Sequence, residues 1–356
     1  MVHKLLLLLT LGALVGCPGD DDDTAGDDDT SLDDDDAADD DSGAGDDDTT
    51  PPPGPWDTGW AIETTLDGQA MIEGSFDGIG PIWWALDTGA ARTYVDSEIT
   101  GTTNNVTGDV VVGPLEFPDH QVGSVDLAEA EAFIGWDLGG LAGQDMFTGR
   151  FVALDYAGLQ AHFLDEVPQE PPPGSSLAIP EATPYELPSS IPVGTFSLIG
   201  AAGLVVDTAL IADTGSGVTI ITEDLFAQID DGTLPQLDGY VWASNYGSDE
   251  CFLTRIPGIG VTGTDLVAGG TWAVVVPTDN HLFPLLQAAG IDAEGFIGYP
   301  FYRQFVVGVD GFDERYLWWP LDDLSHIDPH EWQRVGVEPS WRAGGFFVEM
   351  LYSPSD

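Results

Sequence analysis

The sequence predicts an all-β fold that is built as two related lobes. Short runs of alternating apolar and polar residues, separated by glycine and proline, recur along the chain and predict strands and tight turns, whereas helical periodicity is sparse. The tripeptide Asp-Thr-Gly closes an apolar run twice, at 87–89 and at 213–215. The segments downstream of the two copies also correspond, so the chain contains an internal repeat.

Each acidic turn stands where a buried strand is predicted to end. An apolar run from 79 to 86 precedes Asp87, and a second from 204 to 212 precedes Asp213. A carboxylate at the end of a buried strand costs free energy unless it has a partner or a use. The threonine that follows can fix the turn through its hydroxyl, and the glycine allows close backbone approach. Two copies of one such turn imply one shared site.

A second pattern accompanies the turns. An apolar-apolar-glycine triplet follows each of them farther along the chain, as Leu141-Ala142-Gly143 and Phe296-Ile297-Gly298. The correspondence continues in the same register, from Met146-Phe147 and Phe301-Tyr302 to the segments 152–155 and 307–310. This pattern, from roughly residue 60 to residue 319, resembles the aspartic proteases, and it is most similar to pepsin-like and retropepsin-like bacterial proteins. A third Asp-Thr-Gly, at 57–59, has no strand before it and is interpreted as linker.

The resemblance implies a pepsin-like fold of two β-barrel-like lobes with the active site between them. It implies an aspartic endopeptidase in which Asp87 and Asp213 share a proton and activate a water against the peptide bond of an extended polypeptide substrate, with no cofactor and no metal. The residues that it places beside the dyad are Thr88, Gly89, Thr214, Gly215 and Ser216. Those that it packs against the site are Leu141, Ala142, Gly143, Phe296, Ile297 and Gly298.

Two other functions fit the sequence: a catalytically inactive peptide- or protein-binding lipoprotein on the same fold, and an acidic structural surface protein without a cleft. Two departures from the family favour a loss of catalysis. The first lobe has no tyrosine between Tyr94 and Tyr156 to act as the flap residue of pepsin-like enzymes, and the segment from 94 to 110 is short for a covering hairpin. Tyr246, in a predicted hairpin at 239–249, is either the flap residue from the other lobe or a surface aromatic.

The two turns differ at one position, and the difference predicts an asymmetric dyad. Ser216 can donate a hydroxyl hydrogen bond to the second carboxylate, whereas Ala90 offers none to the first. A donor favours the ionised form of a carboxyl group. We therefore expect Asp213 to be the more readily ionised member of the pair.

The first 17 residues have the features of a secretory signal. A charged start at Lys4 is followed by an uncharged run from 5 to 15 and by Gly16-Cys17, which resembles a bacterial lipobox. The apolar run is too short to span a membrane as a helix. The prediction is lipidation at Cys17 and an anchored, extracytoplasmic protein of the bacterial cell envelope, periplasmic or at the cell surface. The alternative is an ordinary cleaved signal with an incidental cysteine.

Composition divides the remaining chain. Residues 18–55 are aspartate-rich, end in prolines and predict a disordered tether. The N-terminal lobe is predicted at 56–165, an interlobe linker rich in proline and glutamate at 166–192, and the C-terminal lobe at 193–320. The extension 321–356 contains segments at 332–337 and 344–354 that look like the opening strands of a PDZ domain, or else are terminal strands that pack on the second lobe.

Charge and rare residues exclude several functions. The chain has 62 acidic and 8 basic residues, a formal net charge of −54, so a phosphate backbone would be repelled and nucleic acid is not an expected partner. Six scattered histidines lack zinc-ligand spacing, and the tether lacks the glycine turn and terminal glutamate of a calcium loop. Cys251 has no partner except Cys17 and is interpreted as a small semi-buried residue. We expect a monomer.

Overall fold

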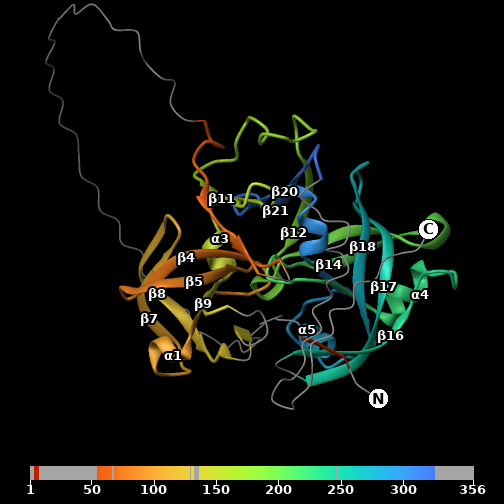
Figure 1. Ribbon diagram of the computed structural model, residues 1–356, viewed down its shortest axis with the longest axis horizontal. Helices are drawn as coiled ribbons and strands as arrows, with labels where there is room; N and C mark the ends of the chain where they lie inside the picture. Colours follow the sequence, from red (N-terminus) through yellow and green to blue (C-terminus); the bar gives the residue numbers. More distant parts are fainter. Residues whose placement is uncertain are drawn as a thin grey trace, which may run out of the picture.

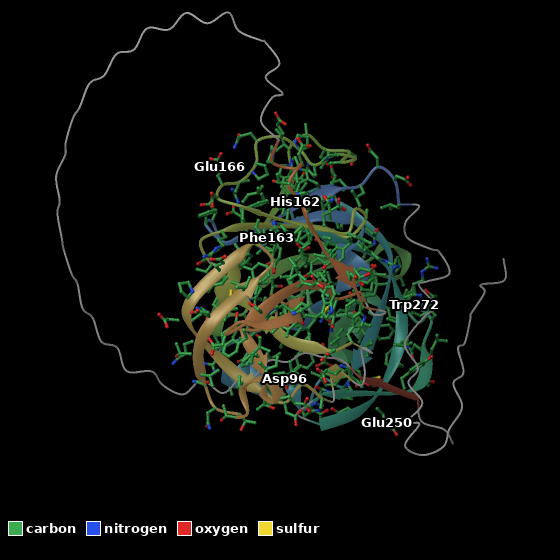
Figure 2. All side chains as sticks on the ribbon, turned by 60° about the vertical axis from the view of Figure 1, so that its left-hand side comes forward. Asp96, His162, Phe163, Glu166, Glu250 and Trp272 are labelled. Atoms are coloured by element: carbon green, nitrogen blue, oxygen red, sulfur yellow. The ribbon has the colours of Figure 1, made fainter. Side chains whose placement is uncertain are left out.

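A computed structural model describes residues 4–7, 54–65, 68–128, 130–131, 136–244 and 247–324 of the chain. The described chain is built mainly of β-strands in two lobes, which lie side by side in Figure 1, the first in orange and yellow and the second in green to blue. The predicted all-β, bilobal fold class is confirmed. Side chains fill the space between the ribbons, and exposed acidic residues such as Glu166 and Glu250 extend at the outside (Figure 2).

The first lobe is a small closed sheet. Its elements are β3 (Glu63–Thr64), β4 (Ala70–Phe76), β5 (Ile79–Leu86), β6 (Tyr94–Asp96), α1 (Ser97–Thr100), β7 (Val106–Val112), β8 (Leu115–Val125), β9 (Leu138–Ala142) and α3 (Gln144–Phe147). The strand order is β3-β4-β5-β9-β6-β8-β7, and a further pairing of β4 with β7 closes the sheet. Asp77 and Gly78 join β4 to β5 with positive φ angles of 47° and 73°. Asp-Gly is a preferred pair for such a two-residue hairpin turn.

The second lobe contains a longer set of elements. They are β13 (Val193–Ile199), a 3-10 turn at Ala201–Gly203, β14 (Val205–Ala212), β15 (Thr219–Thr222), α4 (Glu223–Ile229), β16 (Leu237–Ser244), β17 (Gly247–Val261), β18 (Val267–Val276), α5 (Leu282–Ala288), β19 (Gly295–Ile297) and α6 (Tyr299–Tyr302). The Thr222 hydroxyl caps α4 by accepting from the Leu225 amide at 3.2 Å, and two acidic residues occupy the first turn of the helix.

The internal repeat is visible in the strand pairing. Six pairings of the first lobe (β4–β5, β5–β9, β6–β9, β6–β8, β7–β8 and β4–β7) recur with the same orientation in the second as β13–β14, β14–β19, β15–β19, β15–β18, β17–β18 and β13–β17. β16 is an addition to this plan. Between α1 and β7 the described residues 101–105 form no strand, whereas β16 stands at the corresponding point of the second lobe.

A sheet shared by both lobes connects them. β10 (Phe151–Asp155) of the first half pairs antiparallel with β20 (Phe305–Asp310) of the second, with Ala153 opposite Gly308. The order β12-β21-β20-β10-β11-β2 is completed by β12 (Glu181–Glu186), β21 (Arg315–Pro320), β11 (Gln160–Leu164) and β2 (Trp60–Ala61), near the top of Figure 1. β12 lies within the segment 166–192. It follows residues 165–180, which form no named strand, and precedes the 3-10 turn at Pro188–Ser190. A fully buried aromatic stack on one face of this sheet consists of Tyr302 together with Trp318 and Tyr316 of β21.

Several sequence predictions fall on the chain ends. β1 (Lys4–Leu7) pairs parallel with β16, from Lys4 opposite Tyr240 to Leu7 opposite Ala243. Cys17, residues 18–53 of the tether, Tyr246 and the extension beyond residue 324 lie outside the described residues. In the described part of the chain, no helix has the length and apolar character needed to cross a membrane.

Candidate active site

The two acidic turns lie at corresponding ends of corresponding strands. Asp87 directly follows β5, and its amide donates to the Ala142 carbonyl at 3.0 Å; Asp213 directly follows β14, and its amide donates to the Ile297 carbonyl at 3.1 Å. The predicted apolar triplets therefore lie beside the turns, because β9 and β19 run parallel to β5 and β14.

The glycine of each triplet sits against backbone. A Cβ atom on Gly143 would stand 2.2 Å from the backbone of Arg92, and one on Gly298 would stand 2.2 Å from the Val218 carbonyl oxygen. No side chain fits at either position without moving the main chain of the turn.

Two buried threonines join the turns across the lobe boundary. The Thr88 hydroxyl donates to the Ala212 carbonyl at 2.7 Å and accepts from the Thr214 amide at 3.1 Å. The Thr214 hydroxyl donates to the Leu86 carbonyl at 2.7 Å and accepts from the Thr88 amide at 3.0 Å. Each hydroxyl thus uses both its donor and its acceptor capacity on the opposite lobe. The four bonds hold the two turns in one fixed relation.

The glycines of the turns bring the two carboxyl groups together. A Cβ atom on Gly89 would lie 2.4 Å from the Asp213 carboxyl carbon, and one on Gly215 would lie 2.4 Å from that of Asp87. The Ala90 amide donates to Asp87 Oδ1 at 3.1 Å, and the Gly215 amide donates to Asp213 Oδ1 at 2.8 Å. Asp87 is 4% exposed and Asp213 is 1% exposed, so both acids are withdrawn from water.

Burial and mutual repulsion raise the pKa values of both acids. Desolvation raises the pKa of Asp87 to about 6, opposed by hydrogen bonds from the Asp213 side chain and from the amides of Gly89 and Ala90. Desolvation also raises the pKa of Asp213, and the nearby Asp87 carboxylate raises it further, well above its usual range. The pair therefore still holds a shared proton at a pH where two independent aspartates would both be ionised.

The hydrogen bond on which the asymmetry predicted from Ser216 rests is not formed. The Ser216 hydroxyl donates to the Val218 carbonyl at 2.7 Å instead of to the Asp213 carboxylate. The expected stabilisation of ionised Asp213 is thus missing. The sequence showed a hydroxyl at this position, and its direction depended on the backbone carbonyl two residues later.

Two residues at the site were not predicted. Gln69, just before β4, donates from Nε2 to the Gly215 carbonyl at 2.7 Å, and Tyr316, on β21, donates from its hydroxyl to the Ala212 carbonyl at 2.9 Å. Both side chains are buried. They lie far from Asp213 in the sequence and belong to no motif, so no local signal could have identified them.

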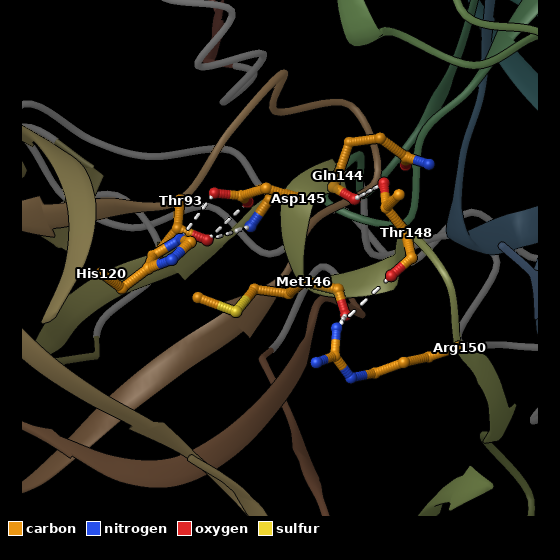
Figure 3. A network of polar contacts seen from close by, with 8 residues as sticks. Thr93, His120, Gln144, Asp145, Met146, Thr148 and Arg150 are labelled. Carbon is orange, nitrogen blue, oxygen red and sulfur yellow. Dashed lines mark hydrogen bonds and ion pairs between the residues drawn. The ribbon is translucent and has the colours of Figure 1, made fainter. Parts of the chain in front are cut away.

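A network of hydrogen bonds around Asp145 contacts Gly143 of the first apolar-apolar-glycine triplet (Figure 3). The Thr93 hydroxyl accepts from the Gly143 amide at 3.2 Å and donates to Asp145 Oδ1 at 2.7 Å. His120 on β8 lies 3.0 Å from Asp145 Oδ2 through its Nε2. The network links β8, the residue before β6 and the start of α3, and it therefore holds Gly143 beside Asp87.

Other chemistry finds little support among the described residues. No group of three or more histidine, cysteine, aspartate or glutamate side chains in that part of the chain could hold a metal ion. Cys251 is free and buried, and desolvation raises the pKa of its thiol to about 12, so it stays protonated at physiological pH. Asp57 of the third Asp-Thr-Gly accepts from the Gly54 amide at 2.7 Å in a local turn, away from the dyad.

Comparison with known proteins finds similarity among solved structures. No family model matches the chain, and no curated protein matches it. Among solved structures, the crystal structure of the aspartic proteinase from Irpex lacteus is similar, with 12% sequence identity, a TM-score of 0.48, and an alignment that covers 75% of this chain and 98% of that one.

Proposed function

We propose that the protein is an aspartic endopeptidase that hydrolyses peptide bonds in extended polypeptides. The observation that carries the proposal is the dyad: two buried carboxyl groups, one from each lobe, each lying against the glycine of the opposite turn. Burying two acids side by side is costly, and the fold holds them there with four reciprocal threonine bonds. Such an arrangement is typical of a catalytic pair with separated protonation states.

We assign the ionised role to Asp87 and the protonated role to Asp213, whose pKa the neighbouring carboxylate raises further. Ionised Asp87 acts as the general base and takes a proton from a water held between the carboxyl groups. Protonated Asp213 donates a hydrogen bond to the scissile carbonyl oxygen and transfers its proton as the tetrahedral intermediate forms. Collapse of the intermediate reverses the roles, because a proton must then reach the leaving amine. The scheme needs no covalent nucleophile.

Cleavage of an unstructured protein tests the proposal. We expect the full chain to degrade casein between acid and neutral pH, to be inhibited by pepstatin, and to lose activity in Asp87→Asn and in Asp213→Asn. The matched control is Asp57→Asn, which changes the same residue type in the Asp-Thr-Gly whose side chain serves only a local turn. A folded wild-type protein that cuts nothing at any pH would instead support the peptide-binding alternative.

The cell location is a second part of the proposal. The leader and Cys17 support a lipid-anchored, extracytoplasmic protein whose aspartate-rich segment acts as a tether. We expect the protein in the membrane fraction of its bacterial host, and we expect Cys17→Ser to remove it from that fraction. Retention of the variant in the membrane would contradict lipid anchoring at this residue.

A further inference from the structure

The backbone carbonyl groups three residues after each acid accept equivalent hydrogen bonds in the two lobes, whereas the carbonyl of Gly215 accepts a hydrogen bond from a side chain. The Ala90 carbonyl accepts from the Gln144 amide at 2.8 Å, and the Ser216 carbonyl accepts from the Tyr299 amide at 2.8 Å. These bonds are equivalent under the internal repeat. The exception is the carbonyl of Gly215, which accepts the side-chain amide of Gln69 from the opposite lobe at 2.7 Å.

Strand register identifies the counterpart of Gln69 in the second lobe. Met71 lies opposite Ala85, two residues before Asp87, and Val193 lies opposite Ile211, two residues before Asp213. Counting back two residues from Met71 and from Val193 makes Gln69 of the first lobe equivalent to Ile191 of the second. Ile191 is a buried apolar residue of the second-lobe core. The fold therefore accepts an apolar side chain at this position, and a buried glutamine there is a departure from its own repeat.

Gln69 is fixed by its backbone bonds to Thr65 and by the contact of its neighbour Gly68. The Gln69 amide donates to the Thr65 hydroxyl at 3.0 Å, and the Thr65 amide donates to the Gln69 carbonyl at 3.1 Å. Gly68, with a φ of +92°, lies flat on the ring of Tyr299 in the second lobe, where a Cβ atom would stand 2.0 Å from the ring. The glutamine thus reaches Gly215 from a position next to Gly68, which itself contacts the opposite lobe.

Gly215 is the residue through which this bond reaches the dyad. Its amide donates to Asp213 Oδ1 at 2.8 Å, and its Cα faces the carboxyl group of Asp87. A shift of Gly215 would alter the surroundings of both acids. We infer that Gln69 is a positioning residue for the dyad, holding Gly215 in place from the opposite lobe; the inference rests on the proposed peptidase function.

Burial of the other end of the amide argues against a purely structural role. Gln69 is 3% exposed, and within the described part of the protein its Oε1 has no hydrogen-bond partner. A buried acceptor without a partner destabilises the fold. An apolar side chain such as that of Ile191 would avoid this penalty. The glutamine is therefore retained for the bond that its Nε2 makes.

Three variants of the full chain test the inference. Gln69→Met keeps the length of the side chain and removes the donor, and Gln69→Glu restores a donor when its buried carboxyl group is protonated at acid pH. Ile191→Met places the same methionine at the counterpart position and is the matched control. The measurements are kcat and KM against pH, the thermal midpoint, and the titration of 13C-labelled aspartate carboxyl groups, which reports on the dyad without any need for activity.

We expect Gln69→Met to lower kcat by about 10- to 100-fold, with a much smaller change in KM, because small displacements of catalytic groups have effects of that size. The upper titration step of the dyad should move to higher pH, since a weaker Gly215 bond stabilises ionised Asp213 less. Gln69→Glu should recover activity toward the acid end of the profile, and Ile191→Met should leave kcat and the titration unchanged.

Two results would overturn the inference. The first is a Gln69→Met protein with the kcat and carboxyl titration of the wild type and only a lower thermal midpoint. The second is a Gln69→Glu protein that matches Gln69→Met at every pH. Absence of cleavage by the wild type would contradict the proposed function alone, because the carboxyl titration would still show whether Gln69 positions the pair.

Discussion

The threonine pair offers a direct test of what joins the lobes. Thr88→Val preserves the shape of the side chain and removes its hydroxyl, which donates to the Ala212 carbonyl and accepts from the Thr214 amide. The carbonyl keeps the Tyr316 hydroxyl as a donor, whereas the Thr214 amide is left with a methyl group where its acceptor stood. The variant therefore loses one complete hydrogen bond and leaves one buried donor without its partner.

The size of the effect follows from these two losses. A net hydrogen bond contributes about 1 kcal/mol, and an unsatisfied buried donor costs about 1–3 kcal/mol, so we expect Thr88→Val to lower the free energy of unfolding by about 2–4 kcal/mol. Thr88 is fully buried, so solvent cannot replace the missing acceptor. The control is Thr88→Ser, which keeps the hydroxyl and removes one methyl group, at a cost of about 1 kcal/mol.

Urea denaturation, monitored by tryptophan fluorescence, gives the unfolding free energy of both variants. The reasoning would be refuted if Thr88→Val and Thr88→Ser had the same unfolding free energy within 0.5 kcal/mol, on the order of the spread between ordinary surface substitutions. Equal stability would mean that the reciprocal bonds add nothing to the packing of the turns.

Three further predictions follow from the dyad and its surroundings. The pKa of Asp87 is raised to about 6, so the folded state binds more protons than the unfolded state. The unfolding free energy should therefore fall by on the order of 3 kcal/mol as pH rises from about 4 through about 6. In denaturation curves, Asp87→Asn should flatten this dependence. Gly89→Ala should abolish cleavage because its methyl group would overlap the Asp213 carboxyl group. Gly269→Ala is the control, because open space surrounds the added carbon, and it should retain wild-type activity. Equal activity of the two variants would contradict the close approach of Gly89 to Asp213. Cys251 should resist alkylation by iodoacetamide at pH 8 until the protein is denatured, because burial holds its thiol protonated, and rapid labelling of the native protein would exclude this environment.

Local patterns were sufficient to predict the elements that repeat. Apolar runs that end in Asp-Thr-Gly predicted strands β5 and β14 with an acid after each, and the apolar-apolar-glycine triplets predicted segments that pack beside the two turns. These features can be predicted because each depends on residues within a few positions of one another, and because each occurs twice in the sequence. The short segment between Tyr94 and Val110 likewise agrees with a first lobe that has no strand corresponding to β16.

The sequence by itself therefore determined the strand-rich class, the two related lobes and the residues of the acidic turns. Only the tertiary structure decided the direction of the Ser216 hydroxyl, the raised pKa values of the two acids, and the contacts of Gln69 and Tyr316 with the second turn. The physical reason is that these properties arise from burial and from hydrogen bonds between segments that are distant in the chain. Gln69 and Gly215 are separated by 146 positions, and Tyr316 and Ala212 by 104, so nothing in either local sequence records the partner that folding supplies.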